Sequence, residues 1–290
     1  MTEFLQYVVG GLAAGSLYAL AALGLTLIFK TSEVVNFANG EMAMVATLAA
    51  YLLLSSYELP YWGAFLGALA FAAVLGVVLE RLFMRPVQRS NHLSQIMVTL
   101  GLFLVLNGTV SVYVFEPQPF PRAVKGAPFE LGGLFISRDA LLTFAVATVI
   151  MLALYLFFKH TLAGIALRAT AQNLITSRLM GVPTGRVYAL TWAVAAVLGA
   201  VAGMLIAPTT GFDPNFMGEV AIKAFAGAIL GGLGNLPGAV VGGLILGVLE
   251  NLIAGYVSTE LKAAFAFSMI LLVLVVRPNG LLGAAAGRRV

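Results

Sequence analysis

The sequence has no cysteine, only two histidines and few charged residues, and each shortage excludes a class of chemistry. Without cysteine the chain cannot form a disulfide, a thiol nucleophile or an iron–sulfur site. His92 and His160 are isolated, and neither forms a His/Glu pair at metal-ligand spacing. We therefore expect no metal site and no cofactor on this chain.

Motifs for catalysis and nucleotide binding are also missing. A phosphate-binding P-loop needs a glycine before its lysine. The residues that precede the five lysines are instead Phe29, Val124, Phe158, Ile222 and Leu261. There is no nucleophile elbow either. We expect no catalytic residue and no enzymatic activity here, so that any use of ATP depends on a partner protein.

Apolar residues are what the sequence has in excess. They make up 61% of the 290 residues, and charged residues make up 10%, against about 25% in soluble domains. The mean hydropathy is +1.01. The apolar runs are long and continuous and do not alternate in strands of about 10 residues. The predicted fold is an all-α, polytopic transmembrane helix bundle.

Nine apolar segments can be drawn. They are Phe4–Phe29, Val34–Leu54, Tyr61–Leu79, Ile96–Phe115, Ala140–Phe158, Val187–Ile206, Val220–Leu233, Ala239–Val257 and Lys262–Val276. The seventh is short, because roughly 14 residues give about 21 Å of helix against about 30 Å of hydrocarbon. We expect eight full spans plus one short or re-entrant helix, which ends in the glycine-rich turn Gly231–Gly238.

The basic residues predict the orientation. With the N-terminus outside, the inner side holds Lys30, Arg81, Arg85, Arg89, Lys159, Arg168, Arg178, Arg186, Arg277, Arg288 and Arg289. The outer loops hold only Arg122, Lys125, Arg138 and Lys262. This asymmetry fits the positive-inside rule and explains the net charge of +4 without nucleic acid. We expect one domain over 1–290, with a periplasmic loop at 116–139, a cytoplasmic loop at 159–186 and a cytoplasmic C-terminus.

The start of the second segment is unusually polar. Asn36, Asn39, Gly40 and Glu41 stand at the head of an apolar run. Polar groups inside a membrane are costly unless each finds a partner. Two interpretations remain open: the groups line a route for a polar solute, or they form hydrogen bonds between helices. A partly unwound entry, with the break at Gly40, would bring them together.

Other polar residues within the segments are fewer. Asn107 lies in the middle of the fourth segment, and Glu250 and Asn251 lie in the eighth. We expect structural hydrogen bonds there, and a local ion pair between Glu219 and Lys223, which stand four positions apart. Glycines four apart, such as Gly199 and Gly203, predict close helix packing.

The internal loop has a helical pattern. Its apolar positions 162, 165, 166 and 169 follow helical spacing, and Gly181 with Pro183 ends the pattern. Such a short helix lies in the membrane interface or inserts into a groove of a partner protein.

Four stretches in order resemble a known family. They are Leu23–Phe29 with Val35–Glu41, Arg168–Asn173 with Met180 and Gly181, Gly231–Gly238, and Arg277–Leu281. Together they resemble the LivH-type permeases of branched-chain amino acid importers of the ATP-binding-cassette class. The resemblance covers nearly the whole chain.

The resemblance implies partners, a location and roles. It implies a multi-pass protein of the bacterial inner membrane that works with membrane lipid, a second LivM-like permease, two cytoplasmic ATPases that bind ATP, and a periplasmic solute-binding protein. Contact with the ATPases would involve Arg168, Ala169, Ala171, Gln172, Asn173, Arg178 and Gly181. From the polar residues themselves, the hypothesis for the pathway or its gate includes Asn36, Asn39, Gly40, Glu41 and Asn107.

This chain departs from the family pattern at two places. Asn39 stands where the family usually has histidine, and Gln172 and Asn173 stand where a carboxylate is common. Related permeases carry other amino acids, urea or short amides, so the cargo stays open. The alternative class is a self-sufficient secondary transporter or channel, in which Glu41 would be the coupling carboxylate.

Overall fold

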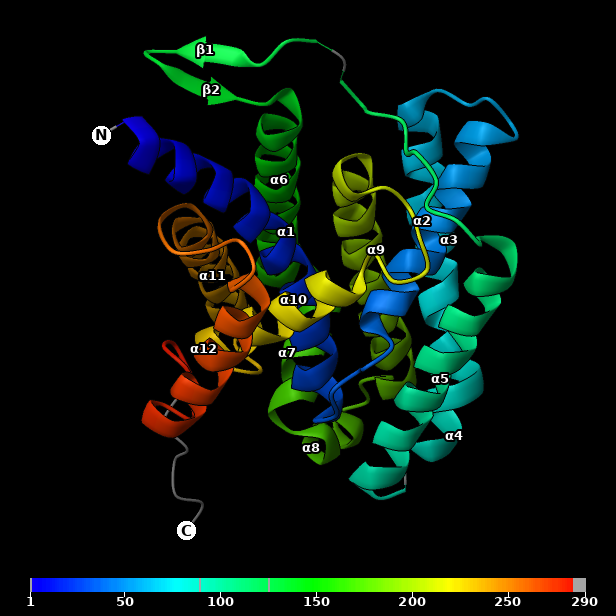
Figure 1. Ribbon diagram of the computed structural model, residues 1–290. Helices are drawn as coiled ribbons and strands as arrows, with labels where there is room; N and C mark the ends of the chain where they lie inside the picture. Colours follow the sequence, from blue (N-terminus) through cyan, green and yellow to red (C-terminus); the bar gives the residue numbers. More distant parts are fainter. Residues whose placement is uncertain (1, 89, 125, 284–290) are drawn as a thin grey trace. The chain divides into compact units, whose positions relative to one another are not determined.

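The computed structural model describes residues 2–88, 90–124 and 126–283, and most of these residues are helical (Figure 1). The helices are α1 (Thr2–Ser32), α2 (Asn39–Ser55), α3 (Tyr61–Leu79), the π-helical turn η1 (Glu80–Met84), α4 (Arg85–Val87), α5 (His92–Tyr113), α6 (Arg138–His160), α7 (Leu162–Gln172), α8 (Leu174–Leu179), α9 (Thr184–Thr210), α10 (Gly218–Gly231), α11 (Leu236–Tyr256) and α12 (Lys262–Val276). Within the loop 116–139, β1 (Phe129–Leu131) and β2 (Leu134–Ile136) form an antiparallel hairpin that the sequence did not predict.

Each of the nine expected apolar segments corresponds to a helix, although residues 34–38 of the second segment precede α2. Two of them, Tyr61–Leu79 and Lys262–Val276, have the same bounds as α3 and α12. In the described part of the chain, six helices are long and apolar enough to cross a membrane. The helices α2, α10 and α12 are shorter, with 17, 14 and 15 residues. The predicted class, a polytopic bundle of apolar helices, is confirmed. The number of full spans stays a prediction.

The predicted orientation stays a prediction as well. Part of its evidence falls on residues outside the described ranges, namely Arg89, Lys125, Arg288 and Arg289. Most of the other basic residues lie near helix ends or in connecting segments, whereas Arg168 lies within α7 and Lys223 lies within α10.

The helices belong to two compact units. The first contains the described residues of Met1–Thr26, Arg122–Thr148 and Gly218–Val290. Its centre is the pair α10 and α11, whose backbones touch at Gly231 and Gly238. Gly232 and Gly234 have φ values of +110° and +87° in the turn between these helices, a backbone conformation that glycine adopts most readily. The short helix and its glycine-rich turn are thus where the sequence predicted them.

The last described residues cap α10. The N–H groups of Leu281 and Leu282 donate to the carbonyls of Leu230 and Gly231, at 2.8 and 3.1 Å. These carbonyls belong to the last turn of α10, where no partner is available within the helix. The segment Arg277–Leu281, which carried part of the family resemblance, therefore has a structural task in completing the end of α10.

The second unit contains Leu27–Pro121 and Val149–Met217 as far as they are described. Its helices α2, α3 and α9 pack closely through small residues. A methyl group added at Gly199 would lie 3.0 Å from Ala43 Cβ of α2, and one added at Gly203 would strike Thr47. The prediction that Gly199 and Gly203 pack against a neighbouring helix is confirmed. The buried core beside them includes Trp192 and Met42.

Candidate functional site

The chain enters α2 through a short non-helical stretch. Residues 33–38 are not helical, and α2 begins at Asn39. Asn36 Oδ1 accepts a hydrogen bond from the N–H of Ala38 at 3.0 Å. A side chain that binds its own backbone in this way competes with helix formation. The predicted unwound entry is confirmed, but the break lies before Asn39, and Gly40 is inside the helix.

Asn36 is held by local contacts. Besides its bond to Ala38, its Nδ2 lies 3.4 Å from Met42 Sδ, and the residue is buried. Both ends of the amide are therefore engaged within α2 and its entry. This geometry assigns Asn36 to the shaping of the backbone.

Glu41 and Asn107 meet in the structure, although 66 positions separate them. Glu41 is only 4% exposed, and its Oε2 accepts from Asn107 Nδ2 at 3.3 Å. The same nitrogen donates to the carbonyl of Pro214 at 2.9 Å, and it lies 3.5 Å from Asn215 Oδ1. One amide thus connects α2, α5 and the segment that precedes α10. A buried carboxylate held by neutral donors can bind a further donor or a cation.

Pro214 and Asn215 were not among the predicted site residues. Asp213 Oδ1 accepts from the N–H of Asn215 at 2.7 Å, so these residues form an Asx-type turn. The sequence signal was the cluster Asp213-Pro214-Asn215, which is typical of a turn. Nothing in that cluster indicated that its carbonyl would face Asn107.

Asn39 and Gly40 lie elsewhere. Both are buried in the first turn of α2, and the Asn39 carbonyl is close to Gly199 of α9. Asn39 is thus at the contact between α2 and α9, beside the small residues that let these helices approach. Of the five predicted pathway residues, Glu41 and Asn107 form a side-chain hydrogen bond between α2 and α5, and the N–H of Asn39 donates to the carbonyl of Asn36 at 3.3 Å within the entry to α2.

A second buried carboxylate was missed by sequence reasoning. Glu80 begins the π-helical turn η1 and is fully buried. Its carboxylate accepts from Arg85 Nη2 at 2.8 Å and from Gln88 Nε2 at 3.1 Å, and Arg85 Nη2 also donates to the carbonyl of Gly185 in α9. Turns of the π type recur at functional sites. This group ties the end of α3 to the start of α9.

The internal loop folds into two short helices, as its pattern predicted in part. Thr161 Oγ1 accepts from the N–H of Gly164 at 3.0 Å and caps α7, and Asn173 Oδ1 accepts from Thr176 at 2.9 Å and caps α8. Gly181 has a φ of +81° just after α8. Arg178 Nε donates to Thr184 Oγ1 at 3.2 Å, which joins α8 to the start of α9.

The buried face of α7 is not its most apolar face. Gly164, Leu167 and Thr170 are buried, because Gly164 packs against the backbone of Phe157 and Phe158. Leu162 is 86% exposed and Ile165 is 49% exposed, although both belong to the predicted apolar positions. Leu162 and Ile165 of the apolar stripe of α7 therefore point away from the rest of its unit. Among the predicted coupling residues, Arg168, Gln172, Asn173, Arg178 and Gly181 are exposed, and Ala169 and Ala171 are half-buried.

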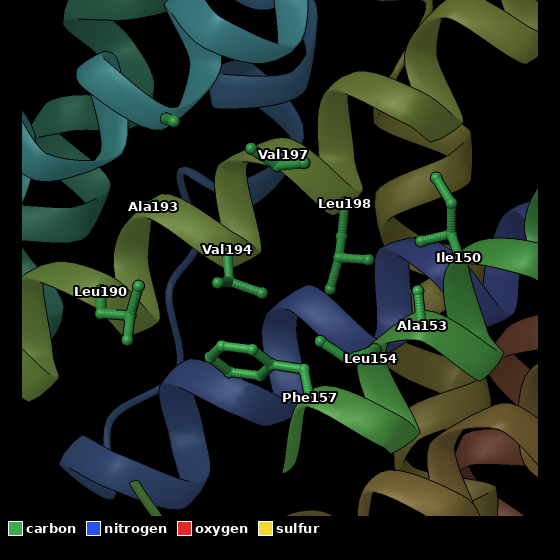
Figure 2. A pocket seen from close by; sticks show the side chains of 10 residues that line it. Ile150, Ala153, Leu154, Phe157, Leu190, Ala193, Val194, Val197 and Leu198 are labelled. Atoms are coloured by element: carbon green, nitrogen blue, oxygen red, sulfur yellow. The ribbon is translucent and has the colours of Figure 1, made fainter. Parts of the chain in front are cut away.

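The cavity shown in Figure 2 is separate from these polar groups. It has a volume of about 350 Å³, and its walls come from α3, α6 and α9. The labelled side chains are all apolar, among them Ile150 and Phe157 of α6 and Leu190 and Leu198 of α9. It offers no group that could fix a polar solute. Across the described residues, no three histidine or acidic side chains gather as a metal site would need.

Apolar membrane-length helices with a buried carboxylate and amide, and an exposed apolar loop helix, define a polytopic membrane protein of the transporter class. Comparison with known proteins identifies the family. The family model "Branched-chain amino acid transport system / permease component" matches residues 7–274. The chain belongs to this family of transport-system permease components, and its relatives are permease subunits and not enzymes.

Three relatives show the extent of the similarity. The high-affinity branched-chain amino acid transport system permease protein LivH of Escherichia coli K12 is 35% identical over 97% of this chain and 96% of its own length. The corresponding BraD of Pseudomonas aeruginosa is 34% identical over the same shares. A probable LivH permease of Methanocaldococcus jannaschii is 29% identical, over 94% of this chain and 91% of its own length. The resemblance inferred from four sequence stretches is confirmed.

Proposed function

We propose that this chain is the membrane-spanning permease subunit of an ATP-binding-cassette importer that carries branched-chain amino acids across a bacterial inner membrane. The observation that carries the proposal is similarity over almost the full length to LivH and BraD, whose names state this cargo. The partners are a second, LivM-like permease, two cytoplasmic ATPases that hold the ATP, and a periplasmic solute-binding protein. The N-terminus lies outside and the C-terminus inside, with eight full spans and α10 as the short or re-entrant helix.

Glu41 and Asn107 belong to the translocation pathway or its gate in this proposal. Asn107 donates to both Glu41 and the Pro214 carbonyl, so a change in the position of α5 must alter both bonds. Asn36, Asn39 and Gly40 support this group by shaping and packing the start of α2. Contact between cargo and Glu41 is not required, because the binding protein can supply the selectivity.

The helices α7 and α8 are the proposed contact with the ATPases. Support comes from their exposed apolar side chains, Leu162 and Ile165 on α7 and Ile175, Leu179 and Met180 at α8, which have no cover within their unit. An amphipathic helix of this kind fits a hydrophobic groove on a partner. Closure of the ATPases would then move α9 through the bond between Arg178 and Thr184.

Reconstitution into vesicles tests the proposed class. The complete set of subunits with the loaded binding protein should hydrolyse ATP faster and take up labelled L-leucine, and omission of the ATPases should stop uptake. Uptake by this chain alone, driven by an ion gradient, would instead establish the secondary transporter or channel. Ligand binding by the cognate binding protein, screened over aliphatic amino acids, urea and short amides, identifies the cargo.

The coupling role has its own test. Leu162→Ser with Leu179→Ser changes two exposed side chains, so insertion and folding should be preserved. We expect loss of ATPase association and of solute-stimulated ATP hydrolysis, measured by co-purification and phosphate release. The control is Leu59→Ser, an exposed leucine in the connection between α2 and α3. Normal stimulation in the double variant would show that α7 and α8 lie only in the membrane interface.

A further inference from the structure

A buried lysine in the first unit has no role in the site described above. Lys223 of α10 is 8% exposed, and its Nζ lies 2.8 Å from Glu250 Oε1 of α11. It also lies 3.4 Å from Glu219 Oε2, one turn earlier in α10, and 5.5 Å from the centre of the Tyr18 ring of α1. The predicted local pair of Glu219 and Lys223 is confirmed, but the shorter bond is to Glu250. Ionisable groups within apolar helices of membrane proteins generally mark function.

The contacts that the two carboxylates make with Lys223 differ in strength. The Glu250 side chain is 3% exposed, and its 2.8 Å bond has the usual length of a charge-assisted hydrogen bond. The Glu219 side chain is 80% exposed, and its 3.4 Å contact is long. Exposed ion pairs contribute little to stability. Glu250 is therefore a permanent partner of Lys223, and Glu219 is a partner that another anion can replace.

The charges of this cluster suit a zwitterion. One ammonium faces two carboxylates, so the bond to Glu250 already neutralises Lys223, and Glu219 carries a surplus negative charge. A lysine ammonium has three donors, and one of them can pass from Glu219 to an incoming carboxylate. The released Glu219 can then accept from an incoming ammonium. The incoming zwitterion adds one positive and one negative charge, so this exchange leaves the net charge of the cluster unchanged, which limits its cost.

We propose that Lys223 and Glu219 bind the carboxylate and the ammonium of an α-amino acid during its passage, and that Glu250 positions Lys223. This inference rests on the proposed function, because it requires amino acid cargo. The inference also makes the proposed function more specific, since urea, a short amide or another uncharged solute has no charges to exchange with Lys223 and Glu219. The cluster thus gives the permease a selectivity for zwitterions in addition to that of the binding protein.

A purely structural task is the competing explanation. The bond between Lys223 and Glu250 joins α10 to α11, and it would hold the short helix in place even without cargo. Glu219 separates the two explanations. Because the Glu219 side chain is exposed and its contact with Lys223 is long, the loss of this carboxylate should not disturb the bond between Lys223 and Glu250. The same loss would remove half of a zwitterion site.

The first experiment uses Glu219→Gln in the complete importer, reconstituted in vesicles with its loaded binding protein. The measured quantity is L-leucine taken up per ATP hydrolysed. We expect a three- to tenfold fall, and no change with the matched control Glu260→Gln, which alters another exposed glutamate of the same unit. Unchanged uptake per ATP in Glu219→Gln overturns the inference. If the unaltered importer takes up no amino acid, the proposed function fails, and the inference falls with it.

The second experiment removes the buried pair without leaving a single buried charge. Lys223→Met combined with Glu250→Gln leaves no unpaired buried ion, since Glu219 is exposed, so the variant should assemble, as buried ion pairs replaced together often do. We expect at least a tenfold loss of L-leucine uptake per ATP, against no loss for Lys262→Met at the start of α12. Full uptake by this double variant overturns the inference. If the variant does not assemble, the Glu219→Gln result decides the question alone.

Discussion

Replacing Asn107 by leucine should weaken the connection between α2, α5 and the Pro214 turn. The change removes the donor from Glu41 Oε2, which is buried, and from the Pro214 carbonyl, which is half-buried. A lost hydrogen bond between membrane helices costs about 0.6 kcal/mol on average, and a buried polar group left without its partner costs about 1–3 kcal/mol in soluble proteins. For two bonds we expect a loss of about 1–4 kcal/mol of stability.

The assay is thermal unfolding of the purified protein in detergent, together with a double-mutant cycle. A chain of this size should lose about 2–4 °C of Tm per kcal/mol. Thr109→Val is the control on the same helix, because Thr109 Oγ1 bonds only to the carbonyl of Val105 within α5. Combining Asn107→Leu with Glu41→Gln should give less than the sum of the two single effects, since Glu41→Gln weakens the same bond that Asn107→Leu removes.

Two results would refute this reasoning. Additivity of Asn107→Leu and Glu41→Gln to within about 0.3 kcal/mol would mean that the two side chains do not interact in the membrane protein. A Tm for Asn107→Leu equal to that of Thr109→Val would mean that water or another group replaces the lost donor. Either result would remove the structural support for a gate at Glu41 and Asn107.

Three further changes test the packing and the buried carboxylate of the fold. Gly76→Ala should cost about 1–3 kcal/mol, because the new methyl group would strike the Trp192 carbonyl of α9, while Gly101→Ala has open space and should leave Tm unchanged. Glu80→Gln should raise amide hydrogen exchange in residues 80–88, since it weakens the bonds to Arg85 and Gln88; equal exchange would contradict this. Gly280→Ala should lower Tm by several degrees, because Gly280 has a φ of +74°; an unchanged Tm would show that the cap of α10 is dispensable.

The helices could be predicted from the sequence because a single physical cause determines them. A backbone in hydrocarbon must satisfy its own hydrogen bonds, so a long apolar run such as Tyr61–Leu79 becomes a helix whatever its neighbours are. The turn after α10 was predictable for a similar local reason, since Gly232 and Gly234 permit positive φ. Each of these predictions uses information contained within a few residues.

Contacts between distant segments could not be predicted in this way. Glu41 and Asn107 were each singled out as polar residues among apolar ones, but their contact depends on how α2 packs against α5. The spacing rule found Glu219 as a partner of Lys223, and it could not find Glu250, which is closer. For α7, the apolar pattern indicated a helix with an apolar face for the membrane interface or a partner, but it could not indicate that Gly164 packs against the backbone at Phe157.

The polar groups of the candidate site therefore divide into two kinds. Asn36 forms bonds only with its own segment, so these bonds can persist when the helices move. Asn107 bonds to Glu41 of α2 and to Pro214, and these bonds must change if α5 moves relative to either. A transport cycle that shifts these helices acts on the second kind and leaves the first intact. The residue to follow through such a cycle is thus Asn107, to which sequence reasoning gave less weight than to the polar residues at the start of α2.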